Sequence, residues 1–190
     1  WSGGFAFFVL MCILTALGFR RRASVAIDQP SAIPADDDGT AAPPPKPRAL
    51  DMILWLALSA CGSVMLLAAT NQISQDVAVV PLLWIVPLAL YLLTFIICFD
   101  SDRWYVRGVF VPLFLAMSLL ALYALQRGAI IPLLPQIVIY AGAMFAACMV
   151  CHGELARARP HPRYLARYYV VMAAGGALGG VFVALVAPRL

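Results

Sequence analysis

The run Cys148-Met-Val-Cys151-His152 carries the most specific chemistry in this chain. Two thiols with this spacing can bond covalently to a c-type haem, and the histidine that follows can ligate its iron. Cys151, His152 and Glu154 could instead supply ligands to a metal ion, but a fourth ligand is not evident in the sequence. The choice between these interpretations depends on where the motif lies relative to the membrane.

Arginines dominate the segment after this motif. Residues of this type beside apolar runs mark the cytoplasmic side of a membrane protein, and they also contact anionic lipid head groups. As a binding site they could hold an anionic ligand or an acidic partner surface; a nucleic-acid partner is not expected. The arginines concerned are Arg157, Arg159, Arg163 and Arg167.

A polar segment, Thr70 to Asp76, separates two apolar runs. It is interpreted as a short external turn, with the lining of an outward-facing polar cavity as the alternative. The residues that would line such a cavity are Asn71, Gln72, Asp76 and Gln136.

Four glycines form two overlapping small-xxx-small pairs in the last apolar run. On a helix such pairs let a neighbouring backbone approach closely, which is how helices associate inside a membrane. A phosphate-binding loop would need a preceding strand, and this run offers none. We therefore predict helix packing through Gly175, Gly176, Gly179 and Gly180.

The chain that positions these residues is strongly apolar. Hydrophobic residues make up 64% and charged residues 12% of it, whereas about a quarter of a soluble domain is charged. Crossing a bilayer takes about 20 apolar residues per helix, and backbone groups in hydrocarbon must be satisfied within the segment. We predict an all-α polytopic integral membrane protein with six transmembrane helices, at about 1–19, 49–70, 77–99, 106–126, 130–151 and 168–187.

Residues 20–48 interrupt this pattern with many prolines and the acidic run Asp36 to Asp38. Such a segment cannot bury enough apolar surface to fold, so we predict a disordered cytoplasmic linker. It divides transmembrane helix 1, residues 1–19, from a five-helix membrane domain, residues 49–190.

The positions of the basic residues predict how the chain is oriented in the membrane. With Trp1 outside, all of the 13 Lys and Arg residues except Arg127 and Arg189 fall in cytoplasmic segments. We therefore expect a multi-pass protein of the bacterial inner membrane with both ends of the chain on the outer side. Because c-type haem is attached on the outer side, this orientation disfavours a haem at Cys148, Cys151 and His152, and no cofactor is expected.

Several motifs resemble the membrane domain of bacterial fused major-facilitator-like/spermidine synthases. They are the polar segment beginning at Thr70 with the apolar run after it, Cys151-His-Gly-Glu-Leu-Ala-Arg157, and Gly175-Gly-Ala-Leu-Gly-Gly180 with Leu185-Val-Ala-Pro188. The resemblance implies a partial major-facilitator-like bundle, with more helices and a soluble aminopropyltransferase-like domain in the complete proteins. That catalytic domain has no counterpart in residues 1–190, so no catalytic residue is carried over.

We expect a non-catalytic membrane domain that acts as a scaffold or as a conduit for a small polar, polyamine-related solute. The first alternative is a structural accessory subunit docked by its glycine-rich helix onto a larger membrane complex. The second is a haem-carrying electron-transfer subunit. The expected partners are membrane lipids and other transmembrane helices of the same or a neighbouring protein.

Overall fold

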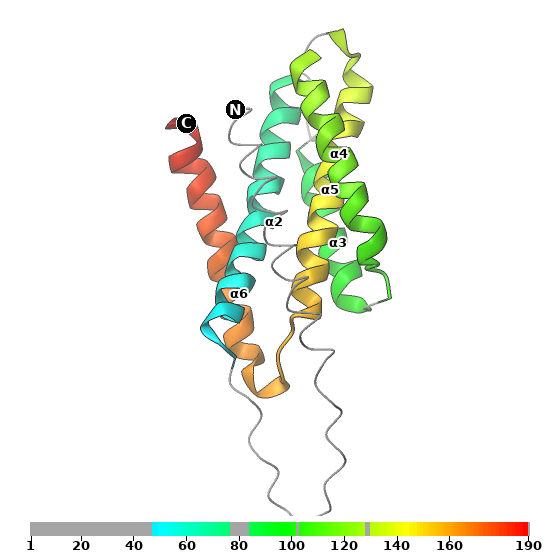
Figure 1. The fold of residues 1–190 in the computed structure, drawn as a ribbon. Helices are drawn as coiled ribbons and strands as arrows, with labels where there is room; N and C mark the ends of the chain where they lie inside the picture. The colour runs from blue at the N-terminus through cyan, green and yellow to red at the C-terminus, as the bar shows by residue number, and fades with distance from the viewer. Residues whose placement is uncertain (1–46, 77–83, 102, 128–129, 190) are drawn as a thin grey trace, which may run out of the picture.

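The computed structural model describes residues 47–76, 84–101, 103–127 and 130–189, which form a bundle of helices without a strand (Figure 1). The predicted first transmembrane helix and most of the linker lie outside the described residues. The helices are α2 (Ala49–Asp76), α3 (Ile85–Asp100), α4 (Arg107–Arg127), α5 (Leu133–Arg157) and α6 (Leu165–Val181). A 3-10 turn, Pro162–Tyr164, precedes α6, and a π turn, Phe182–Val186, and a 3-10 turn, Ala187–Arg189, follow it.

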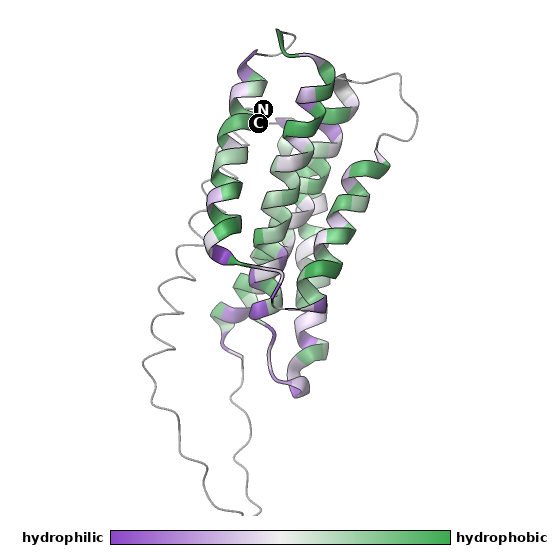
Figure 2. Cartoon of the chain, turned by 90° about the vertical axis from the view of Figure 1, so that its right-hand side faces the viewer, coloured by the Kyte–Doolittle hydropathy of each residue, from purple (hydrophilic) through white to green (hydrophobic). Residues whose placement is uncertain are grey.

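Four of these helical segments are long and apolar enough to cross a membrane: Ala49–Ser74, Arg107–Arg127, Leu133–Arg157 and Pro162–Arg189. α3 is a shorter apolar helix of 16 residues. The prediction of an all-α membrane protein is therefore confirmed. Hydrophobic residues run along the helices (Figure 2). Many of the large apolar side chains are exposed, as expected for groups that face lipid rather than water.

Local sequence explains where several helices begin. Asp51 Oδ2 accepts a hydrogen bond from the Arg48 backbone N–H at 2.9 Å, which satisfies one of the free donors at the start of α2. Pro87 in α3 and Pro135 in α5 both lie in the first turn, where a missing N–H breaks no helical hydrogen bond.

Two predicted boundaries are wrong. The turn expected at Thr70 to Asp76 is the last part of α2, because Ile73 is buried in a cluster with Ala121, Ala124 and Tyr140. That packing keeps the polar segment helical, and residues 77–83 beyond it lie outside the described residues.

α5 likewise continues to Arg157 instead of ending at Cys151, so His152 and Glu154 belong to its buried interior. The predicted helices at 106–126 and 168–187 differ less from the structure, in which α4 begins at Arg107 and α6 begins at Leu165.

α5 lies at the centre of the described bundle and packs against α2, α3 and α4, whereas α6 packs mainly on α2 at one side (Figure 1). Hydrophilic residues gather where α5 ends and α6 begins (Figure 2). We call this the basic end of the bundle, because it holds Arg48, Arg103, Arg107, Arg157, Arg159, Arg163 and Arg167, whereas Arg127 and Arg189 lie at the opposite end.

The contact between α2 and α6 depends on two of the four glycines. Gly175 and Gly179 are buried against the backbone of α2, and a Cβ on Gly179 would lie 2.5 Å from the Ala60 carbonyl oxygen. Gly176 is less tightly enclosed, with Ser63 Oγ 3.3 Å from its hypothetical Cβ, and a Cβ on Gly180 would meet no described atom. Close approach is therefore a property of Gly175 and Gly179, and the expected packing role of Gly180 stays a prediction.

We predict opposite effects of the same substitution at adjacent glycines. Gly179→Ala should lower stability by about 1–3 kcal/mol, because the new methyl group overlaps the Ala60 carbonyl. Gly180→Ala should be neutral or stabilising by up to about 1 kcal/mol, because alanine favours a helix and space is available. Thermal unfolding of the detergent-purified protein measures both, and equal shifts for the two variants would contradict the assigned packing face.

Candidate functional site

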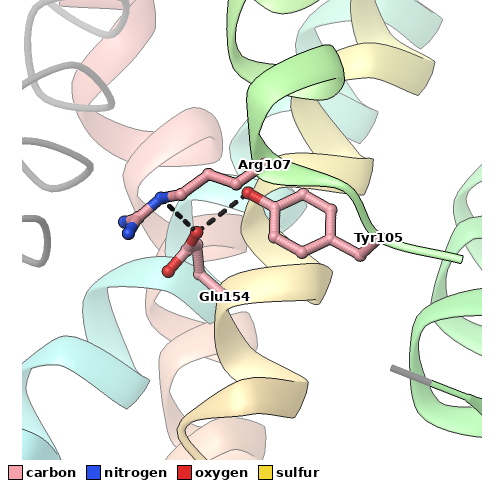
Figure 3. A network of polar contacts seen from close by, with 3 residues as sticks. All are labelled: Tyr105, Arg107 and Glu154. Atoms are coloured by element: carbon pink, nitrogen blue, oxygen red, sulfur yellow. Dashed lines mark hydrogen bonds and ion pairs between the residues drawn. The ribbon is translucent and has the colours of Figure 1, made fainter. Parts of the chain in front are cut away.

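A buried carboxylate joins three elements at the basic end of the bundle (Figure 3). Tyr105 Oη donates a hydrogen bond to Glu154 Oε1 at 2.9 Å, and Arg107 Nε forms an ion pair with the same oxygen at 2.9 Å. The Glu154 side chain is 3% exposed and that of Arg107 is 23% exposed. The last turns of α5 are thereby tied to the first residue of α4 and to the connector before it.

Gly153 makes room for this arrangement. The Tyr105 ring lies directly against the α5 backbone at Gly153, where any Cβ would overlap ring atoms. Burial, and then the neighbouring Glu154 carboxylate, raise the pKa of Tyr105 well above its usual value. The hydroxyl therefore stays protonated and remains a hydrogen-bond donor to Glu154 at physiological pH.

A carboxylate buried at this depth would be strongly destabilising without a partner. Removing one member of a buried ion pair typically costs about 3–5 kcal/mol, and the partial exposure of Arg107 makes a smaller value appropriate here. The network is consequently able to hold helices in place, and it leaves Glu154 engaged by two donors.

His152 forms a second buried polar contact, about half a helical turn before Glu154 in α5. Its Nδ1 lies 3.1 Å from Thr94 Oγ1, and its ring packs edge-on against Tyr91 and Phe95. Thr94 donates its single hydroxyl proton to the Tyr91 carbonyl at 2.8 Å, so we assign Nδ1–H as the donor to Thr94 Oγ1. Gly62 of α2 lies on the Nε2 side of the ring.

The CxxCH thiols are part of the packed interior. Cys148 and Cys151 are buried in a cluster with Met65, Tyr105 and Met144. Attachment of a macrocycle to both sulfurs would require these helices to separate, so the described packing does not fit a covalent haem. Among the described residues, no group of three or more His, Cys, Asp or Glu side chains is arranged to hold a metal ion.

The residues proposed to line a polar cavity lie at the opposite end from Glu154. Gln136 is buried and donates to Tyr140 Oη at 3.3 Å, and Asn71 and Gln72 are half-buried on α2. The cluster around Ile73 and Tyr140 brings these two helix ends together. The Asp76 side chain lies outside the described part of the chain, and the cavity itself stays a prediction.

The four arginines after the CxxCH motif do not act alike. Arg159 lies over the Phe99 ring, 5.1 Å from its centroid, and donates to the Phe99 carbonyl at 3.4 Å, so it joins the chain after α5 to the end of α3. Arg157, Arg163 and Arg167 are exposed.

Sequence reasoning did not identify Tyr105, Arg107 and Thr94 as partners of buried α5 side chains. One signal was present, since Glu154 is an isolated acidic residue within a largely apolar stretch and must find a partner if that stretch is helical. The predicted helix ended at Cys151, so Glu154 was expected outside the membrane-spanning segment, where a carboxylate needs no buried partner.

No family model, no curated protein and no solved structure matches this chain. The resemblance to fused major-facilitator-like/spermidine synthases therefore depends on the motifs alone.

We predict that Thr94→Val lowers stability by about 1–3 kcal/mol, because it leaves the His152 Nδ1–H buried without an acceptor. Thr70→Val is the matched control, since Thr70 Oγ1 donates only within α2, to the Leu66 carbonyl at 2.7 Å. Denaturant or thermal unfolding in detergent compares the two variants. If Thr70→Val is as destabilising as Thr94→Val, the contact to His152 has no special role.

Proposed function

We propose that this chain is a non-catalytic, membrane-embedded scaffold domain resembling the membrane part of bacterial fused major-facilitator-like/spermidine synthases. In this proposal the basic end faces the cytoplasm of a bacterial inner membrane and both ends of the chain lie outside. The domain carries no haem and holds helices, and any domain joined to them, in a fixed arrangement.

The ion pair between Glu154 and Arg107 is the observation that carries this proposal. Among the described side chains, Glu154 is the one buried carboxylate. Its charge is balanced by Arg107, so the pair offers no net negative charge to a cationic solute. A polyamine-type solute would need such a charge along its path.

Three other polar side chains also connect elements instead of facing an open site. Trp55 Nε1 donates to the Ala158 carbonyl at 3.1 Å, Ser59 Oγ donates to the Met172 carbonyl at 2.6 Å, and Tyr168 Oη donates to the Leu155 carbonyl at 2.8 Å. These bonds join α2 to the chain after α5, α2 to α6, and α6 to α5. Interhelical hydrogen bonds of this kind support a structural role, because lipid gives helices no hydrophobic reason to associate.

The accessory-subunit alternative draws on one specific observation. α6 packs mainly on α2, and most of its remaining surface is exposed in the described structure. A neighbouring membrane protein could cover that surface, and co-purification in a mild detergent would detect it.

We predict that proteoliposomes containing this chain take up labelled spermidine no faster than empty liposomes. Glu154→Gln should lower the thermal stability of the protein without changing this baseline, since the carboxylate serves packing. The matched acidic control is Asp100→Asn, which removes a carboxylate at an exposed position and should leave stability nearly unchanged.

Saturable uptake by the wild-type chain that Glu154→Gln abolishes at unchanged thermal stability would contradict the scaffold proposal. It would favour the solute conduit and make Glu154 part of the solute path.

A further inference from the structure

One face of the α6 segment combines two arginines with a continuous apolar surface. Its members follow one another at intervals of three or four residues, which places them on the same side of a helix. Arg163 lies in the 3-10 turn Pro162–Tyr164, which leads directly into α6, and the other five residues lie in α6 itself. In order from the basic end, the face consists of Arg163, Arg167, Val170, Ala174, Leu178 and Val181.

This lipid face, as we call these six residues, is open in the structure. All six residues are exposed, including Val170 at 68%, Leu178 at 52% and Val181 at 51%. Gly175 and Gly179, which contact α2, are not among them. The face therefore points away from the helix that holds α6 in the bundle.

The two arginines have no acidic partner among the described residues, and no Asp or Glu follows Glu154 in the sequence. Arg107, in contrast, pairs with Glu154, and Arg159 is held by the ring and the carbonyl of Phe99 at the end of α3. Arg163 and Arg167 are four residues apart, one in the turn before α6 and one in its first turn, and two long arginine side chains at this spacing can both approach one phosphate group.

We propose that the lipid face binds an anionic diacyl phospholipid. Arg163 and Arg167 hold its phosphate at the membrane boundary, and one acyl chain lies along Val170, Ala174, Leu178 and Val181. Charge complementarity selects the head group, and the apolar continuation of the same face distinguishes a membrane lipid from a free phosphate ion. The inference depends on the membrane setting of the chain and not on its scaffold role.

The test titrates the full chain, purified in a neutral detergent, with phosphatidylglycerol or phosphatidylcholine and counts bound lipids by native mass spectrometry. Each arginine near a lipid surface contributes about five-fold in affinity, so we expect about 25-fold preference for phosphatidylglycerol. Arg163→Gln with Arg167→Gln should abolish most of this preference, and lysine at both positions should retain much of it. Added salt should weaken it.

Arg127→Gln is the matched control, because Arg127 is an exposed arginine at the opposite end of the bundle. Equal binding of the two lipids by the wild-type chain would overturn the proposal, as would an equal loss of preference in Arg127→Gln. Competition by glycerol phosphate at the same concentration as phosphatidylglycerol would show a free-phosphate site and overturn the acyl-chain contact. Unchanged thermal stability of the glutamine variants in neutral detergent excludes unfolding as the cause of lost binding.

Discussion

A polar group buried at membrane depth must find its partner within the protein, since hydrocarbon offers none. In this bundle the requirement acts most strongly on α5, which carries Glu154 and His152 on its buried surface. Glu154 is bound by Arg107 and Tyr105, and His152 is bound by Thr94. These contacts fix α5 to α3, to α4 and to the connector between them. The central position of α5 follows from these contacts as well as from its apolar packing.

The second interaction that stabilises the bundle is the close approach of two helix backbones. Gly175 and Gly179 allow α6 to contact α2 directly, and the hydrogen bond from Ser59 to Met172 adds a polar link across the same interface. Van der Waals contact of this kind replaces the hydrophobic effect, which cannot drive helices together in lipid. Two modes of association therefore operate side by side, with polar contacts around α5 and small residues between α2 and α6.

The helical membrane fold could be predicted from the sequence because apolar length is nearly sufficient to specify a transmembrane helix. The ends of α2 and α5 could not, since both helices continue through polar segments whose burial depends on distant residues. Ile73 keeps the end of α2 helical by packing on α4 and α5, and Glu154 is buried because Arg107, far away in the sequence, reaches it. Similarly, the glycine spacing predicted helix packing, but the choice of Gly175 and Gly179 depends on where α2 lies.

The central claim is that Glu154 serves to join helices, and a double-mutant cycle tests it most directly. Unfolding free energies would be measured for Glu154→Gln, Arg107→Gln and the double variant, with Arg103→Gln as the exposed control at the same end of the bundle. We expect a coupling energy of at least about 1 kcal/mol between Glu154 and Arg107, and additivity within about 0.5 kcal/mol for Glu154 with Arg103. Additive effects of Glu154→Gln and Arg107→Gln would contradict the account.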